Sequence, residues 1–377
     1  VMINESWYRQ YDLGHLPAVV VPDTLQALQS LAAHWRSLYD IQVVGITGSI
    51  GKSSTKEVVS AVLAQRFHVT RSRKSYNNEV GLPISVLEIS PDTEVCVLEM
   101  GGAYAFGEIT DLSKIARPTI GIVTNVSHSH LARMGTLEAI AETKAELVDA
   151  LPAAGVAILN VDDERVRRMA ERADCRVVFY GLDDAANVRA TDLQSMGMDG
   201  ISFTLHRNGQ VNRVRVPLMG RHSVHMALVG FAVGFELGMS IEEIMRGFQS
   251  PDIQLRLVLI PAVNGARILD DTYNANPASS LAALGLLEEL DATRRIAVFG
   301  DMLELGAYEE EGHRLVGGRA ADVVDALYVV GDKAKIIARA AAELNPRLPI
   351  EIFDDKTILV DVLRRDLKAG DLVLIKG

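Results

Sequence analysis

The sequence predicts an α/β protein with two main units: a P-loop-type central unit with a mostly parallel sheet, and a smaller Rossmann-like α/β unit after it. Short β-branched runs alternate with segments of helical spacing from residue 41 to 181 and again from 266 to 375. Such alternation is typical of parallel sheets covered by helices. A glycine-rich turn followed by Lys-Ser separates the first run from the first helix, which is typical of a phosphate-binding unit.

The first series supplies the elements of the central unit. Strands are expected at 41–46, 94–100, 119–124, 156–160 and 176–181, and helices at 52–65, 107–116, 137–150 and 162–173. Residues 187–217 then alternate apolar and polar side chains around Asn208-Gly209, which indicates a hairpin. Two more helices are expected, at 222–237 and 240–248.

The second series begins where the chain turns polar near Pro251. Its strands are expected at 266–270, 295–299, 326–330, 349–353 and 371–375, and its helices at 278–290, 308–321, 333–343 and 356–367. Residues 1–40 hold a strand at 19–24 that ends in a helix cap at Asp23 or Thr24, followed by a helix, which is too little for a core of their own. We therefore expect domains at 41–250 and 251–377, with 1–40 as the remnant of a further domain and both chain ends cut.

Bulk composition narrows the class of protein. The chain has 377 residues, of which 48% are hydrophobic and 23% charged, as in globular domains. A net charge of −11 without a basic run argues against a nucleic-acid partner. Cys96 and Cys175 lie in apolar runs and are expected to be free thiols. No run is long enough to span a membrane and no signal peptide is visible, so we expect a cytoplasmic protein.

The strongest local signal is the stretch VVGITGSIGKSS at 43–54. Its glycines let backbone N–H groups approach a polyphosphate, and the N-terminus of the next helix adds partial positive charge. Lys52 adds a full charge, and the Ser53 hydroxyl suits Mg²⁺. The loop is a short G-x-x-G-K-S form, because Ile46 stands where the longer pattern has glycine. The alternative is an ordinary strand-to-helix turn with a surface lysine.

Three more residues are candidates for the same edge of the sheet. Glu99 ends the strand-like run EVCVLEM, where a carboxylate is either a ligand for a nucleotide-bound metal ion or a solvated charge. His130 follows the run IGIVTN and is either catalytic, a metal ligand or a solvated loop histidine. Lys144 is surrounded by acidic residues in its helix, and this spacing alone favours a surface lysine in ion pairs.

Two polar stretches mark strand ends in the second series. In LDDTYNANP, at 269–277, Asp271, Asn274 and Asn276 suggest either ligand contacts or an asparagine-rich turn. GDMLELG, at 300–306, follows another strand and carries two acids. Ligands of open α/β sheets bind at the carboxyl ends of strands. The clusters therefore predict polar sites along the facing edges of the two units.

Eight stretches, in this order, resemble the Mur ligase family: TGSIGKSS, SYNNEVGLP, LEMGG, TNVSHSHL, TKAEL, ILNVDD, DDTYNANP and GDMLELG. The resemblance spans about residues 19–377, and the last two stretches favour the members that add D-alanyl-D-alanine. It implies an ATP-dependent amide ligase of peptidoglycan precursor synthesis, with UDP-MurNAc-tripeptide and D-Ala-D-Ala as substrates. ATP would phosphorylate the tripeptide carboxylate, and the dipeptide amine would attack the acyl phosphate. The cofactor would be Mg²⁺, and a monomer is expected.

The resemblance also implies roles for individual residues. Lys52, His130 and Lys144 would be catalytic, with Lys144 carbamylated, and residues 1–40 would be the end of a UDP-binding domain. Ser53, Glu99, His130 and the Lys144 carbamate would serve metal ions. The ATP-binding set would be Gly48, Ser49, Gly51, Lys52, Ser53, Ser54, Arg256 and Asp271, and the substrate-binding set Asn77, Asn78, Asn274 and Asn276.

The chain departs from the family pattern at the segment expected to touch the adenine. The family shows G-x-H-N-x-x-N-A, and this chain reads GRHSVHMA, with Ser223 and Met226 at the asparagine positions. Ser75 also stands where the family commonly has asparagine. Two alternatives therefore stand beside the leading hypothesis: a Mur-type ligase with a different amine substrate, and a nucleotide-binding homologue impaired in catalysis.

Overall fold

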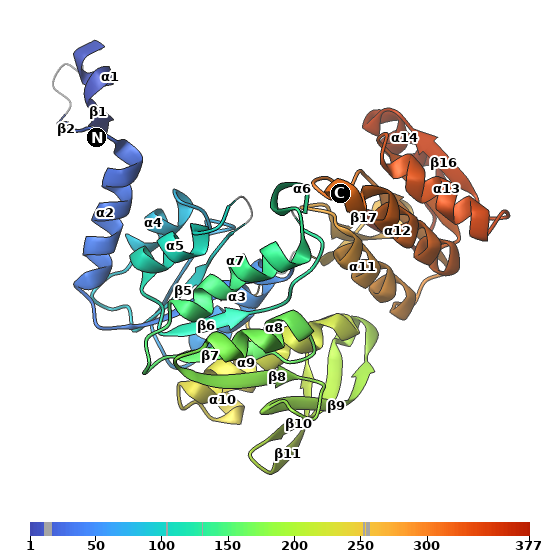
Figure 1. Ribbon diagram of the computed structural model, residues 1–377. Helices are drawn as coiled ribbons and strands as arrows, with labels where there is room; N and C mark the ends of the chain where they lie inside the picture. The colour runs from blue at the N-terminus through green and yellow to red at the C-terminus, as the bar shows by residue number, and fades with distance from the viewer. Residues whose placement is uncertain (11–16, 103–104, 130, 252, 254–256) are drawn as a thin grey trace.

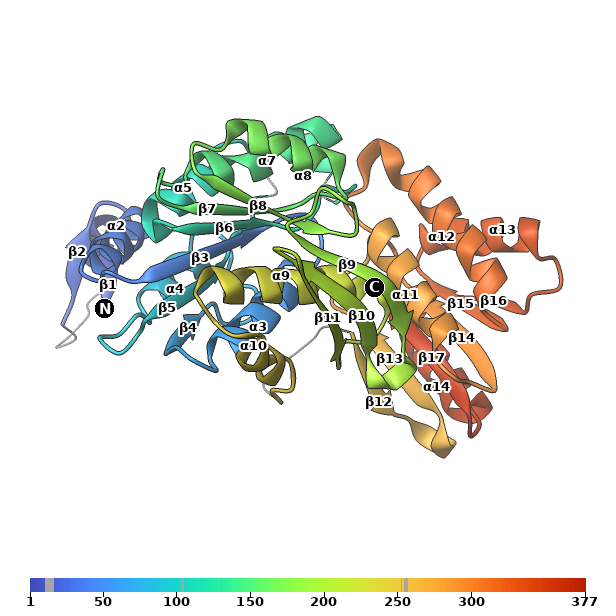
Figure 2. The ribbon, with the colours of Figure 1, turned by 90° about the horizontal axis from the view of Figure 1, so that it is seen from below.

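The described residues form three sheets, each with its own helices (Figures 1 and 2). The structure is a computed structural model that describes residues 1–377 except 11–16, 103, 104, 130, 252 and 254–256. A two-stranded sheet lies near the N-terminus, a nine-stranded sheet forms the central unit and a six-stranded sheet forms the C-terminal unit. His130 and Arg256, both predicted site residues, lie outside the described residues.

The central sheet has the strand order β11-β10-β9-β8-β7-β6-β3-β5-β4. Pairing is parallel from β4 to β9, whereas β9, β10 and β11 pair antiparallel. The hairpin predicted around Asn208-Gly209 is confirmed as the turn between β10 and β11. The strands are β3 (Gln42–Thr47), β4 (Val69–Arg71), β5 (Val95–Glu99), β6 (Ile120–Val123), β7 (Val156–Asn160), β8 (Arg176–Gly181), β9 (Val188–Ser195), β10 (Ile201–Arg207) and β11 (Gln210–Val216).

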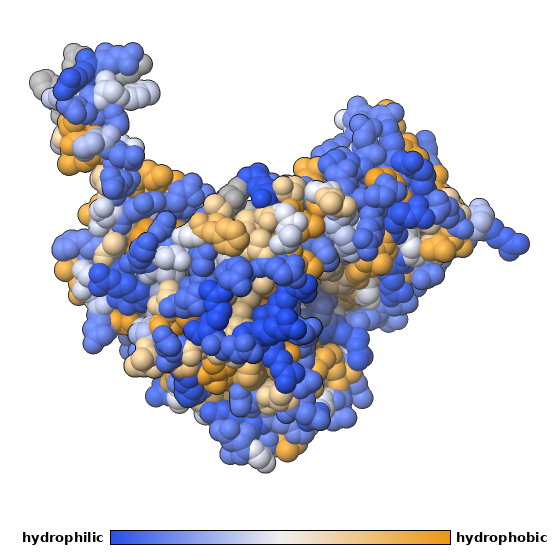
Figure 3. All heavy atoms as spheres, viewed as in Figure 1, coloured by the Kyte–Doolittle hydropathy of each residue, from blue (hydrophilic) through white to orange (hydrophobic). Residues whose placement is uncertain are grey.

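Helices cover both faces of this sheet, because its middle strands carry apolar side chains on both sides. Val44 of β3 belongs to the core on one face and Val43 to the core on the other. In Figure 2 the first face lies below the sheet and carries α3 (Lys52–Leu63), α9 (Val224–Glu236) and α10 (Ile241–Phe248). The second face carries α4 (Gly81–Val86), α5 (Glu108–Ala116), α6 (Leu131–Met134), α7 (Leu137–Asp149) and α8 (Glu164–Arg168). Hydrophilic side chains dominate the outer surface over α7 and α8 (Figure 3).

The C-terminal unit is a smaller sheet of order β12-β13-β17-β14-β15-β16. Its strands run parallel except β12, which pairs antiparallel with β13 at the edge. The core forms around Leu269, Phe299 and Leu374. The elements are β12 (Val258–Pro261), β13 (Arg267–Asp271), α11 (Pro277–Glu289), β14 (Arg294–Phe299), α12 (Glu309–Val323), β15 (Ala326–Val330), α13 (Ala334–Leu344), β16 (Ile350–Phe353), α14 (Lys356–Asp366) and β17 (Asp371–Lys376).

The N-terminal segment is attached to the central unit through one helix. It comprises β1 (Met2–Asn4), α1 (Glu5–Gln10), β2 (Val19–Val21) and α2 (Thr24–Ser37). Asp23 caps α2 by accepting a hydrogen bond from the Gln26 N–H, as predicted. The buried Arg36 guanidinium donates to the carbonyl oxygens of Ala116 and Tyr39 and so fixes the end of α2 to the central unit. The part before α2 projects away from the rest (Figures 1 and 3).

The predicted fold class is confirmed, and most predicted elements begin and end within two residues of the observed ones. The single helix expected at 162–173 is wrong: α8 ends at Arg168 and a 3-10 turn, η1 (Met169–Arg172), follows it. The short elements β4, α4, α6 and β12 were not expected, because three to six residues show too little periodicity. The predicted boundaries near residues 40 and 250 stay predictions. Among the described helices, none is both long and apolar enough to cross a membrane.

Candidate active site

The glycine-rich loop between β3 and α3 is held by hydrogen bonds to the loop that follows β6. The Asn125 backbone oxygen accepts from the Ser49 N–H at 2.9 Å, and its side-chain oxygen accepts from the Ile50 N–H at 3.0 Å. Gly48 has φ +140°, and a Cβ there would meet the Thr124 hydroxyl oxygen at 2.0 Å. The loop therefore needs glycine at this position, and the hydrogen bonds to Asn125 hold its shape.

Lys52 begins α3 and lies along the inside of the loop. Its Nζ donates to the Gly48 carbonyl oxygen at 2.7 Å. Since the first N–H groups of a helix have no partner within the helix, α3 offers donors and partial positive charge at the same point. Ammonium, helix N-terminus and loop together form a cradle suited to a polyphosphate.

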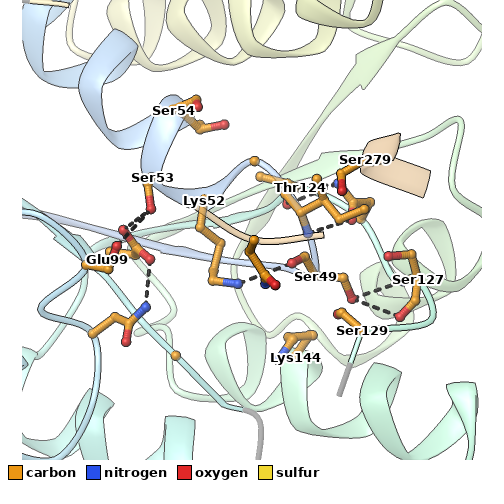
Figure 4. A pocket seen from close by; sticks show the side chains of 18 of the residues that line it. Ser49, Lys52, Ser53, Ser54, Glu99, Thr124, Ser127, Ser129, Lys144 and Ser279 are labelled. Carbon is orange, nitrogen blue, oxygen red and sulfur yellow. Dashed lines mark hydrogen bonds between the residues drawn. The ribbon is translucent and has the colours of Figure 1, made fainter. Parts of the chain in front are cut away.

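The side chains of Ser53 and Glu99 point toward one another beside Lys52 (Figure 4). The Ser53 hydroxyl donates to one Glu99 carboxylate oxygen at 2.7 Å, and the Asn77 side-chain amide donates to the other at 2.7 Å. Glu99 is 1% exposed, so the interpretation of a solvated strand-end charge is wrong. A hydroxyl and a buried carboxylate are oxygen ligands that Mg²⁺ accepts, and their position beside the phosphate cradle fits such an ion.

The spacing of acidic residues around Lys144 favoured a surface lysine in ion pairs, and this interpretation is wrong because Lys144 is buried. The residue is 3% exposed, and Nζ donates to the Gly102 carbonyl oxygen. Burial, and secondarily the positive charge of Lys52, lowers the pKa of Lys144 to about 7. The acidic neighbours are engaged elsewhere: Glu142 pairs with Arg172, and Glu146 accepts hydrogen bonds from backbone N–H groups at the start of α5. Lys144 is therefore a buried amine that faces the site.

The C-terminal unit contributes its own strand ends to the site. Asp271 ends β13, and Lys376 ends the neighbouring β17, where its Nζ lies 2.7 Å from an Asp271 carboxylate oxygen. Lys376 Nζ also donates to the Asn274 carbonyl oxygen at 2.6 Å. Asn276 caps α11 by accepting from the Ser279 N–H, and its side-chain oxygen is thus already used in a helix cap. Sequence reasoning missed Lys376; its signal was a lysine at the end of an apolar strand.

One cleft of about 1260 Å³ collects these groups between the central and C-terminal units. Residues of both units near α9 and α11 line the cleft. Although the chain carries a net charge of −11, the described lining also includes three lysines: Lys52, Lys144 and Lys376. Gly48 lies behind it and contributes the carbonyl that holds Lys52. The predicted site residues that line the cleft are Ser49, Gly51, Lys52, Ser53, Ser54, Asn77, Asn78, Glu99, Lys144, Asp271, Asn274 and Asn276.

The segment that departs from the family pattern lines the same cleft. Ser223 is buried, and its hydroxyl donates to the Met219 carbonyl oxygen at 2.6 Å. Met226 is partly buried and offers a thioether to the cleft. Burial lowers the pKa of the neighbouring His222 to about 4, so that imidazole is neutral at pH 7.

Comparison with known proteins places both units in one family. The Mur ligase middle domain matches residues 46–234, and the Mur ligase glutamate ligase domain matches residues 255–377. The UDP-N-acetylmuramoyl-tripeptide–D-alanyl-D-alanine ligase of Bacillus subtilis is 34% identical over 95% of this chain and 78% of its own length. The Escherichia coli protein of the same name is 33% identical over 96% and 79%.

Solved structures give the same result. MurF from Acinetobacter baumannii superposes with a TM-score of 0.86 at 28% identity, covering 97% of this chain and 80% of that one. MurF ligase from Thermotoga maritima, in complex with ADP, has a TM-score of 0.83 at 27% identity, covering 97% and 83%. The chain belongs to the Mur ligase family.

Proposed function

We propose that the chain is an ATP-dependent amide ligase that adds D-alanyl-D-alanine to UDP-N-acetylmuramoyl-tripeptide in peptidoglycan precursor synthesis. The observation that carries the proposal is the cleft, in which a phosphate cradle on one unit faces Asp271 and Lys376 on the other. The two relatives with this enzyme name, at 33% and 34% identity, support the choice of substrates. The ADP complex of a structural neighbour supports ATP as the nucleotide.

The cleft meets the chemical demands of such a reaction. A carboxylate is a poor electrophile, so an oxygen of the tripeptide carboxylate first attacks the γ-phosphorus of ATP, and ADP leaves. The D-Ala-D-Ala amine then attacks the acyl carbon, phosphate departs and the amine loses a proton. Lys52 and the N-terminus of α3 would hold the polyphosphate and stabilise the charge that develops on it. The second unit would cover the site and exclude water.

Ser53 and Glu99 are the residues that would hold Mg²⁺ on the phosphate side. The ion would neutralise phosphate charge during transfer. Asn77 orients the Glu99 carboxylate through its amide and is thereby placed next to the reacting groups. His130 is proposed as a ligand of a second ion from the family resemblance.

We propose that Lys144 is carbamylated and faces the metal side of the site. Only a neutral amine combines with CO₂, and burial keeps a large share of Lys144 neutral at pH 7. A carbamate would also replace the repulsion between two lysines by an attraction. Lys144→Ala should abolish ligase turnover, and added short carboxylates should restore part of it. Turnover like that of the unmodified chain in Lys144→Ala would exclude the carbamate role.

The remaining contacts divide between the two substrates. Gly48, Ser49, Gly51 and Ser54 would complete the phosphate contacts, and Asp271 with Arg256 would reach the nucleotide from the C-terminal unit. Asn77, Asn78, Asn274 and Asn276 are proposed to face the peptide substrates. One chain supplies both walls of the cleft, which supports a monomer as the active form. Its nucleotide substrates support a cytoplasmic site of action.

The test is product formation from ATP, Mg²⁺, UDP-MurNAc-tripeptide and D-Ala-D-Ala, followed by phosphate release and mass spectrometry. The proposal predicts phosphate release only when both peptide substrates are present, together with one UDP-MurNAc-pentapeptide per phosphate. Product with other amines but not with D-Ala-D-Ala would assign the chain to a different Mur-type ligase. ATP binding without any product would favour the catalytically impaired homologue, which Ser223 and Met226 motivate.

A further inference from the structure

The central and C-terminal units touch at a small contact outside the cleft, which we call the interunit dock. On the central unit it consists of His128, Ala132 and Arg133, in the loop after β6 and in α6. On the C-terminal unit it consists of Glu304 and Tyr308, in the segment between β14 and α12. The His128 and Tyr308 rings stack with centroids 3.8 Å apart and planes 16° apart. Figure 1 shows α6 reaching toward the C-terminal unit.

Two polar contacts fix the register of the dock. The Ala132 N–H donates to the Glu304 carbonyl oxygen at 3.0 Å, and the Arg133 guanidinium lies 2.8 Å from the Glu304 carboxylate. Gly306 brings the backbones together: a Cβ there would meet the Ala132 Cα at 2.9 Å, and its φ is +56°. Backbone and side-chain groups of both units therefore fit closely at this contact.

Apolar packing continues the contact into the central core. Tyr308 packs against the hydrophobic cluster that contains Val126, Leu131 and Ile140. A side chain of the C-terminal unit thus completes a core of the central unit. Separation of the units would expose this surface to water.

The C-terminal side of the dock is rigidly braced. The fully buried His313 accepts from the Met302 N–H at 3.2 Å through Nε2, and its Nδ1 bonds the Glu309 carbonyl oxygen. The Asp301 carboxylate accepts from the N–H groups of Lys333 and Ala334. The GDMLELG stretch therefore forms a braced turn that presents Glu304 and Tyr308 to the other unit.

The central side of the dock leads directly to the phosphate loop. The loop that bears His128 begins at Asn125, which holds the Ser49 and Ile50 N–H groups. The Ser127 N–H also donates to the Ser49 hydroxyl at 2.9 Å. His128 of the dock thus directly follows Ser127, which is hydrogen-bonded to the phosphate loop.

We propose that Glu304 and Tyr308 are positioning residues for the ligase reaction, which hold the C-terminal unit and the loop after β6 in the arrangement that closes the cleft. This inference rests on the proposed function. Neither residue lines the cleft, so both act through the backbone of the docked loop. A loosened dock would admit water to the acyl phosphate, and phosphate would then be released without amide product.

Charge reversal tests the polar half of the dock. Arg133→Glu and Glu304→Arg should each lower kcat for the pentapeptide about tenfold, and the double variant should restore most of it, because the pair is re-formed with opposite sense. Arg314→Glu is a matched control, since Arg314 pairs with Glu343 within the C-terminal unit. Equal losses in the single and double variants, or no loss in either single, would overturn the proposal.

Substitution of Tyr308 tests the stacked half and separates positioning from folding. Tyr308→Leu should raise the ratio of phosphate released to pentapeptide formed about fivefold or more. Its melting temperature should stay within about 2 °C of that of the unmodified chain. Tyr308→Phe keeps the stacked ring and should behave like the unmodified chain. A tight one-to-one ratio in Tyr308→Leu would contradict the proposal. If the unmodified chain makes no pentapeptide, the proposed function fails; if it does and the variants keep the ratio, only the dock inference fails.

Discussion

At the scale of single residues, two lysines in the cleft differ in what surrounds their ammonium groups. The Lys52 ammonium donates to the Gly48 carbonyl oxygen of the phosphate loop, while the Lys144 amine is buried and donates to the Gly102 carbonyl oxygen. The first is placed to bind a phosphate as a cation, and the second to react as a neutral amine. The two positions therefore respond differently to substitution.

Lys52→Ala should remove the ATP-dependent thermal stabilisation of the chain. Ligand that binds the folded state at about 100 times its Kd stabilises by about 2.7 kcal/mol, which is a shift of several degrees in melting temperature. The measurement is a melting curve with and without ATP and Mg²⁺. Lys114→Ala is the control, because Lys114 is exposed and pairs with Asp111. An unchanged ATP-induced shift in Lys52→Ala would contradict the phosphate-loop assignment.

Lys144→Met should stabilise the chain at neutral pH in CO₂-free buffer. The pKa of Lys144 is about 7 when folded against an ordinary 10.5, so between these values the unfolded chain binds more protons. The stability contributed by Lys144 is therefore lowest below pH 7 and rises toward pH 10.5. The melting temperature of Lys144→Met should exceed that of the unmodified chain by a few degrees at about pH 6.5, and the gap should narrow by about pH 10. A gap that does not change with pH would contradict the buried neutral amine.

At the scale of elements, the phosphate loop is a unit made from two strand ends. β3 provides the glycine turn, and β6 provides Thr124 and Asn125 beneath it. The sequence predicted the turn because its glycines and Lys-Ser are contiguous. It did not predict the support, because Asn125 lies 75 residues away and its partners follow from the β3–β6 pairing.

Gly48→Ala should abolish ATP binding while the chain stays folded. The added Cβ would meet the Thr124 hydroxyl at 2.0 Å, so the loop must move away from its support. Gly197→Ala is the control: it also has positive φ, at +61°, but a Cβ there meets nothing within 4 Å. Calorimetric titration with ATP and Mg²⁺ measures the difference. ATP affinity in Gly48→Ala equal to that of the control would show that the loop shape is not required.

At the scale of the whole molecule, two α/β units meet at the cleft and at the interunit dock, and Met219 of the central unit also packs against the C-terminal core. Strand and helix periodicity predicted both units, because each strand and helix is a local pattern with apolar residues at a regular spacing. Burial of Lys144 was not predicted from its helix, because its acidic neighbours bond Arg172 and the start of α5 instead. The stack of His128 on Tyr308 could not be predicted, since it depends on how two sheets that are far apart in the sequence meet.

The most direct test of the central claim is oxygen transfer from the tripeptide carboxylate to phosphate. UDP-MurNAc-tripeptide labelled with ¹⁸O in its terminal carboxylate is incubated with ATP, Mg²⁺ and D-Ala-D-Ala. The ¹⁸O content of the released phosphate is then measured by mass spectrometry. Reaction through an acyl phosphate predicts one ¹⁸O in each phosphate and one pentapeptide for each phosphate. Unlabelled phosphate, or phosphate released without pentapeptide, would contradict the assignment of this cleft as the site of an ATP-dependent amide ligase.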